Sequence, residues 1–246
     1  MTSEPSALAG DLADRIERIR AAIDAATARA GRPADSVSLV GVTKTTPATH
    51  VYAAARLGLT HFGENRIQEA LPKIATLNAL ATAEEVRRIR WHFIGHLQSN
   101  KARSALENFA MIESVDSPRL AQTLDRLAAE RGQPVSVLLE VNIGEEPSKN
   151  GFRPTELTEA FAELCSLAHL EIRGLMTVAP QVDAPERARP FFRQLRELRE
   201  RLVAEHPAAS LPELSMGMSG DFPVAIEEGA TLVRIGRAIF GERPTP

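Results

Sequence analysis

Apolar residues recur along the chain in two alternating patterns. Short runs rich in Val, Ile and Leu, such as VSLVGVTK at 37–44 and VSVLLEVN at 135–142, are typical of parallel strands covered on both faces. Between these runs, stretches such as TELTEAFAELCSLA carry apolar residues three and four positions apart, which is typical of amphipathic helices. The pattern predicts strands at 37–44, 60–65, 90–96, 110–116, 135–142, 170–178, 212–218 and 231–241.

A strand followed by a helix, repeated about eight times, predicts an α/β fold, a closed (β/α)8 barrel of the TIM type. An open doubly wound sheet is the alternative, but the first strand lacks the glycine-rich turn of dinucleotide-binding folds. A helix precedes the first strand and ends at Gly31-Arg32-Pro33. Its apolar positions are Leu8, Leu12, Ile16, Ile19 and Ile23. Because no linker divides the chain, we expect one domain over residues 1–246, with residues 1–33 as an added helix on the barrel.

Composition and charge exclude several classes of protein. Hydrophobic residues make up 43% and charged residues 25% of the 246 positions, as in an ordinary globular protein. The net charge of −3 gives no electrostatic reason to expect nucleic acid as a partner. No segment has the apolar length of a membrane span or signal peptide, so we expect a cytoplasmic protein. The only cysteine, Cys165, has apolar helical neighbours and is predicted to be a buried structural thiol.

Lys44 closes the first predicted strand, where a lysine needs an explanation. Active sites of such barrels lie at the C-terminal ends of the strands, and lysine is among the residues least often buried. A desolvated lysine amine loses its proton more readily, and a free amine attacks an aldehyde to form a Schiff base. Lys44 is therefore a candidate for covalent attachment of an aldehyde.

The loop after the seventh predicted strand, SMGMSGD, is a candidate phosphate site. It carries small residues before the short helix FPVAIEEG, and helix starts in this part of a barrel offer backbone N–H groups to anions. A capped turn is the alternative explanation. On the eighth strand, Arg234 and Gly236 share a face, although Arg234 could be a structural ion-pair partner and Gly236 a packing residue. An aldehyde at Lys44, a phosphate at the loop and a ring nitrogen at Arg234 together describe pyridoxal 5′-phosphate (PLP).

Other chemistries are less well supported. His92 and His96 lie on one predicted strand without a carboxylate spacing that would complete a metal site, so we expect none. Glu64 and Glu140 both lie near predicted strand ends, but nothing in the sequence fixes the separation that a glycosidase acid pair needs.

Eight motifs, in order, give the chain a specific resemblance to a known family. They are VGVTKT, FGENRIQE, WHFIGHLQSNK, SVDS, EVNIGEEPSKNGF, GLMTVAP, LSMGMSGDF and VRIGRAIFGER. Over nearly the whole length after the first helix, the chain resembles the pyridoxal phosphate homeostasis protein family. This resemblance implies a barrel like the N-terminal domain of alanine racemase and a role in vitamin B6 homeostasis.

The resemblance also implies roles for single residues. Lys44 would hold PLP as a Schiff base, Arg234 would face the pyridine nitrogen, Asn65 would border the ring and Met176 would pack near it. The residues implied for the phosphate are Ser215, Met218, Ser219 and Gly236. The chain departs from the family at Arg237, where many members carry threonine, which leaves a hydroxyl contact to the phosphate in doubt.

Carrier and catalyst remain the two main alternatives. An amino-acid racemase needs a second base opposite the lysine, which racemases supply as a tyrosine from an added domain. This chain ends soon after its eighth predicted strand, and its only tyrosine, Tyr52, lies in the helix after Lys44. We therefore expect a PLP carrier, a monomer with PLP-dependent apo-enzymes as partners, rather than a racemase. A degenerate barrel acting as a partner-binding scaffold is the third alternative.

Overall fold

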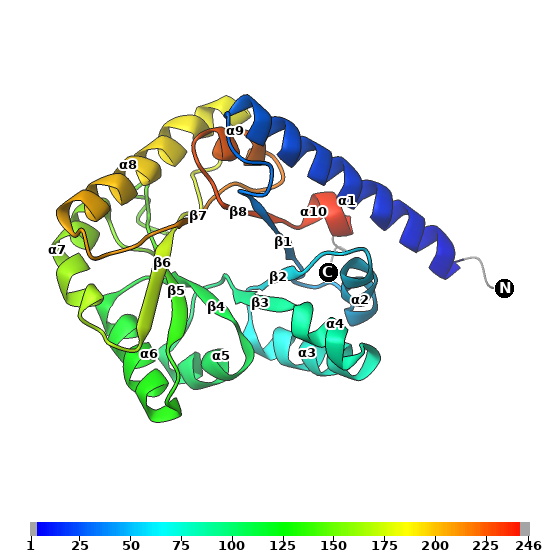
Figure 1. Cartoon of the computed structure of the whole chain (residues 1–246), viewed down its shortest axis with the longest axis horizontal. Helices are drawn as coiled ribbons and strands as arrows, with labels where there is room; N and C mark the ends of the chain where they lie inside the picture. The colour runs from blue at the N-terminus through cyan, green and yellow to red at the C-terminus, as the bar shows by residue number, and fades with distance from the viewer. Residues whose placement is uncertain (1–3, 242–246) are drawn as a thin grey trace.

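Eight parallel strands close into a barrel in sequential order, with β8 paired to β1 (Figure 1). The computed structural model describes the backbone of residues 4–241 and the side chains of residues 10–241. The (β/α)8 prediction is confirmed. The strands are β1 (Ser38–Val42), β2 (His61–Glu64), β3 (Arg90–Phe93), β4 (Met111–Val115), β5 (Val135–Glu140), β6 (Leu170–Met176), β7 (Glu213–Ser215) and β8 (Leu232–Ile235).

Helices surround the strands as an outer ring (Figure 1). They are α1 (Glu4–Arg29), α2 (Ala48–Arg56), α3 (Ile67–Leu80), α4 (Ala83–Arg88), η1 (Ser99–Lys101), α5 (Ala102–Asn108), α6 (Pro118–Arg131), α7 (Pro154–Cys165), η2 (Pro185–Ala188), α8 (Arg189–Glu205), α9 (Phe222–Glu227) and α10 (Arg237–Phe240). The observed strands are shorter than the predicted runs, and two elements were not predicted as such. The run 231–241 contains both β8 and α10, and a capping box of Thr82 and Glu85 starts the additional helix α4.

The barrel has two separate apolar cores. The larger one lies between the strands and the helices, and Phe62, Phe161 and Phe192 are among its fully buried members. The smaller one joins side chains from strands on different sides of the ring, which places it inside the barrel. Its members are Val40, Leu138, Met176 and Leu232, with Met111 packed against them. Met176 therefore lies in the barrel interior.

Helix α1 lies across the side of the barrel where β8 meets β1 (Figure 1). It packs on α9 and α10, and Ile16, Ile19 and Ile23 are buried there as predicted. The side chain of Leu8 lies outside the described residues. No helix in the described part of the chain is long and apolar enough to cross a membrane.

The prediction for Cys165 was wrong, because its side chain is exposed. The inward face of α7 is formed by Leu157, Phe161 and Leu164, at spacings of four and three. Cys165 is the last residue of the helix, one position past Leu164, and so points away from that face. Apolar neighbours in sequence did not indicate burial here.

Candidate functional site

A cavity of about 880 Å³ opens at the C-terminal ends of the strands. Its wall is built by the ends of β1 and β8 and by the segments that follow β1, β2, β3, β5, β6, β7 and β8. Six of the eight residues proposed from the sequence line it, namely Lys44, Asn65, Met218, Ser219, Arg234 and Gly236. Met176 and Ser215 are fully buried below it and are not part of its lining.

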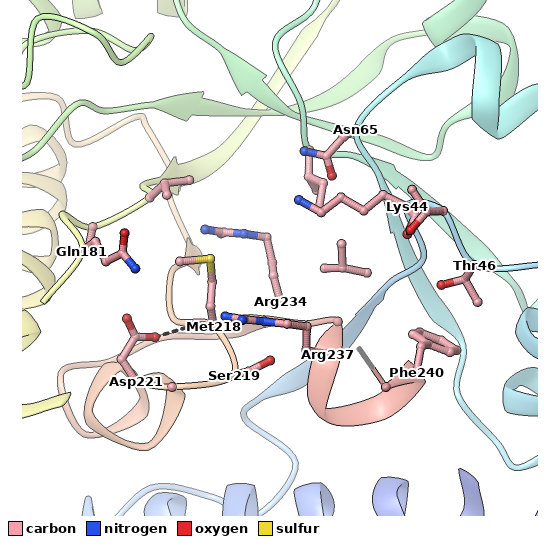
Figure 2. A pocket seen from close by; sticks show the side chains of 18 of the residues that line it. Lys44, Thr46, Asn65, Gln181, Met218, Ser219, Asp221, Arg234, Arg237 and Phe240 are labelled. Atoms are coloured by element: carbon pink, nitrogen blue, oxygen red, sulfur yellow. Dashed lines mark hydrogen bonds between the residues drawn. The ribbon is translucent and has the colours of Figure 1, made fainter. Parts of the chain in front are cut away.

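Lys44 lies two residues beyond the end of β1 and reaches into the cavity from the β1–α2 loop. Figure 2 shows its side chain directed toward Asn65 and the centre of the cavity. The next residue, Thr45, has a positive φ of 63°, so the chain turns sharply just after the lysine. The sequence prediction placed Lys44 on the strand, but its position in the loop still places it at the barrel mouth.

A buried ion pair between Lys73 and Glu64 connects the segment after β1 to the end of β2. Lys73 of α3 donates to Glu64 Oε1, and it also donates to the carbonyl oxygen of Thr43 at 2.5 Å. The hydroxyl of Thr43 donates to the same Glu64 oxygen at 2.6 Å. Because Thr43 precedes Lys44 and Glu64 precedes Asn65, the pair fixes two cavity residues at once. One oxygen of Glu64 is therefore committed to Lys73 and Thr43.

Asn65 is held in place by a close contact with the following loop. A Cβ atom on Gly95 would lie 2.2 Å from the carbonyl oxygen of Asn65, so only glycine fits there. The side-chain Oδ1 of Asn65 is buried and has no hydrogen-bond partner among the described residues. This acceptor is therefore available to a donor that enters the cavity.

The β7–α9 loop forms the opposite end of the cavity. Gly217 has a φ of 93°, and a Cβ atom there would lie 2.6 Å from the Cβ of Ala225. The N–H of Met218 donates to Asp221 Oδ1 at 2.6 Å. Within the described part of the chain, no group accepts from the N–H of Ser219 or of Gly220. Those two N–H groups can therefore bind an anion.

Arg234 lies between these two ends and is almost fully buried (Figure 2). Its Nη1 donates to Ser215 Oγ at 2.5 Å, and its Nη2 donates to the carbonyl oxygen of Thr177 at 2.7 Å. The hydroxyl of Ser215 in turn donates to Glu113 Oε2 at 2.5 Å. The side chain of Ser215 is thus committed to Arg234 and Glu113, and it contacts the cavity only through Arg234.

Arg237 adds a second guanidinium to the cavity wall. It is exposed, and Figure 2 shows its head group beside Met218, on the same side as Ser219. Its charge thus lies near the N–H groups of the β7–α9 loop. The sequence alone had left open whether this residue contacts a phosphate.

Acidic groups gather on another part of the barrel mouth. Burial, together with the charge of Asp116, raises the pKa of Glu140 at the end of β5 to about 7. Asp116 also binds His96, whose Nδ1 lies 2.8 Å from its Oδ2. Among the described residues, no group of three or more His, Cys, Asp or Glu side chains could hold a metal ion.

The sequence reasoning missed several cavity residues, of which Lys149 is the most important. It lies in the loop after β5, pairs with Glu146 at 2.5 Å, and donates to the carbonyl oxygens of Val178 and Ala179. Its position in the motif EEPSKNGF was a signal, because this loop follows a strand end. His50 and Gln181 also line the cavity.

Comparisons with known proteins agree with this arrangement. Residues 15–244 match the family described as the alanine racemase N-terminal domain. The chain is 43% identical over 230 residues to a pyridoxal phosphate homeostasis protein of Aquifex aeolicus, covering 94% of this chain and 97% of that one. It is 38% identical over 239 residues to the protein of that name from Escherichia coli K12, covering 95% and 97%.

Solved structures give the same result. PipY of Synechococcus elongatus PCC7942, determined with PLP bound, is 40% identical and superposes with a TM-score of 0.81, covering 94% of this chain and 100% of that one. Alanine racemase of Clostridium difficile 630 superposes with a TM-score of 0.64 at 15% identity, covering 85% of this chain and 53% of that one. At that identity, the second likeness shows the fold alone.

Proposed function

Because the chain belongs to the pyridoxal phosphate homeostasis protein family, we propose that it binds PLP in the cavity at the mouth of its barrel. PLP carries an aldehyde, a phosphate, a ring hydroxyl and a ring nitrogen. The observation that carries this proposal is that one cavity brings together an amine, two N–H groups that no described residue engages and a buried acceptor that lacks a partner. These groups belong to Lys44, to Ser219 and Gly220, and to Asn65.

Lys44 would hold the cofactor covalently, because a lysine amine can condense with an aldehyde to a Schiff base with release of water. The N–H groups of the β7–α9 loop and Arg237 would receive the phosphate, with Gly236 leaving room beside Val42. Asn65 Oδ1 would accept a hydrogen bond from the ring hydroxyl, and Arg234 would face the ring nitrogen. Met218 would border the phosphate, and Met176 would support the ring from below.

We propose a carrier that holds and releases PLP, rather than a racemase. Arg234 cannot accept a proton, so it disfavours the protonated ring that stabilises carbanions. Tyr52, the only tyrosine of the chain, donates its hydroxyl to Glu85 on α4 and is not part of the cavity lining. On this proposal the chain acts as a single-domain monomer that exchanges PLP with apo-enzymes.

The test is to trap the bound molecule chemically. Purified protein is mixed with PLP, its visible absorption is recorded, and borohydride reduction is followed by peptide mass mapping. We expect a visible band that reduction removes, and a reduced adduct on Lys44. Lys44→Ala should lose both while its thermal unfolding stays cooperative, because a loop lysine contributes little to the core.

Lys149→Ala is the matched control, because Lys149 lines the same cavity. This variant should keep the band and the adduct on Lys44. An adduct on Lys149 instead, or no band at saturating PLP, would overturn the proposal. Transfer of PLP to an apo-enzyme would support the carrier role, and inversion of alanine or serine, followed by chiral analysis, would establish a racemase instead.

A further inference from the structure

A continuous chain of hydrogen bonds crosses the interior of the barrel and ends at Arg234. His61 Nδ1 lies 2.9 Å from His92 Nε2, and His92 Nδ1 lies 2.6 Å from Glu113 Oε1. Glu113 Oε2 accepts from Ser215 at 2.5 Å, and Ser215 accepts from Arg234 at 2.5 Å. The five residues come from β2, β3, β4, β7 and β8. None of the first four is in the cavity lining, so the function proposed above does not use them directly.

These five polar side chains lie inside the barrel, so each of them costs free energy of folding unless it is hydrogen-bonded. The apolar side chains of Val40, Leu138, Met176 and Leu232 also lie in the barrel interior, and Glu113 is fully buried. A buried carboxylate needs both a counter-charge and hydrogen bonds to each of its oxygens. Arg234 supplies the charge, with Nη1 4.0 Å from Glu113 Oε2, while His92 and Ser215 supply the hydrogen bonds.

Glu113 is ionised in this setting, which fixes the direction of each hydrogen bond. Burial raises the pKa of its carboxyl, but the hydrogen bond and charge of His92 and the charge of Arg234 outweigh burial, so that the pKa lies below its ordinary value. A carboxylate only accepts, so both His92 Nδ1 and Ser215 Oγ must donate to it. Because the single proton of Ser215 points at Glu113, its lone pairs face Arg234.

We infer that Glu113 and Ser215 are positioning residues for Arg234. Glu113 fixes the rotamer of Ser215, and Ser215 in turn fixes the position of Nη1 of the Arg234 guanidinium. The carbonyl oxygen of Thr177 fixes the position of Nη2. The guanidinium is thereby held at the cavity floor with its charge partly balanced. This inference rests on the proposed function, since Arg234 acts on PLP only if PLP occupies the cavity.

The test compares Glu113→Gln and Ser215→Ala with Glu107→Gln, an exposed carboxylate on α5. A glutamine at position 113 removes the negative charge and can accept from only one of the two neighbours, because its amide offers an acceptor on one side and a donor on the other. We expect its dissociation constant for PLP to rise about tenfold relative to Glu107→Gln, as for loss of a hydrogen bond to a charged group. The midpoint of the pH titration of the visible band should fall. Arg234 then loses Glu113, which acts on it most strongly of its three carboxylates, and keeps only Glu140 and Asp221.

Ser215→Ala separates positioning from direct contact with the phosphate. If Ser215 acts through Arg234, this variant should lower the affinity for PLP and the affinity for pyridoxal, which lacks the phosphate, by the same factor. A loss confined to PLP would show that Ser215 binds the phosphate and would overturn the inference. An unchanged affinity and an unchanged pH midpoint in both variants would also overturn it.

The inference and the proposed function fail in different ways. If wild-type protein gives no borohydride-trapped adduct on Lys44, the proposed function has failed. If the wild-type adduct forms and both variants behave like Glu107→Gln, only the positioning role has failed. Should Glu113→Gln not fold, Ser215→Ala still decides, because it removes the bridge and leaves both charges in place.

Discussion

Arg237 brings a second guanidinium to the barrel mouth, beside Arg234. Its guanidinium lies beside Met218, near the N–H groups of the β7–α9 loop (Figure 2). An arginine there can form charge-assisted hydrogen bonds to a phosphate, which a threonine can form only through its hydroxyl.

We therefore expect Arg237→Thr to weaken PLP binding about tenfold, as for loss of a hydrogen bond to a charged group, and to leave pyridoxal binding unchanged. Titrations of both ligands against the wild type and the variant measure this. Arg237→Lys keeps the charge, so its affinity for PLP should lie between that of the wild type and that of Arg237→Thr. An equal loss for PLP and pyridoxal would show that Arg237 acts on the fold or the ring instead.

At the scale of single residues, the sequence identified most of the proposed residues that line the cavity, but not the contacts that hold their side chains in place. Lys44, Asn65 and Ser219 could be predicted because each follows a strand end, and strand ends meet at one side of a parallel barrel. Ser215 was expected at the phosphate but is fully buried. Alternation along a three-residue strand says which residues share a face, but it does not say how deep in the barrel each one lies.

Among the elements, α3 has an unusual role, because its buried Lys73 ties the end of β1 to the end of β2. The ammonium bonds Glu64 and the carbonyl oxygen of Thr43, and both acceptors are buried. Removing one partner from a buried ion pair leaves the other charge uncompensated.

Lys73→Met should therefore lower the free energy of unfolding by about 3–5 kcal/mol, although methionine nearly conserves the volume. Denaturant unfolding of the ligand-free protein measures this loss. In the double variant Lys73→Met/Glu64→Gln the buried charge is gone, and part of the loss should be recovered. If Glu64→Gln lowers the free energy of unfolding by the same amount in the Lys73→Met variant as in the wild type, the two residues do not act as a pair.

Over the whole molecule, the closed barrel concentrates ionisable groups at one end, so that stability depends on pH. Burial and the charge of Asp116 raise the folded-state pKa of Glu140 from 4.5 to about 7. Between these two values the unfolded chain has released the proton and the folded protein still holds it. Folding therefore loses stability as the pH rises through this window, and the full cost is present above the folded-state pKa.

Glu140→Gln removes this cost. Its free energy of unfolding should exceed that of the ligand-free wild type by roughly 3 kcal/mol at pH 8, and the excess should shrink toward pH 5. Denaturant unfolding at several pH values gives the comparison, with the exposed Glu159→Gln as the control. An excess that does not vary with pH would mean that Glu140 is not the titrating group.

The sequence by itself determined the order of strands and helices, the closed barrel, the family and the lysine at the barrel mouth. Strand and helix patterns are local, and so are the motifs that carry the resemblance to the family, which the comparisons confirmed. Tertiary structure alone decided that Cys165 is exposed, that Lys73 is buried, and that Ser215 meets Glu113, 102 positions away in sequence. The physical reason is that burial and long-range contacts depend on how elements far apart in sequence pack together. The bond between Ser215 and Glu113 crosses the barrel and forms only once the strands have closed, and no local pattern records which side chains then share the interior.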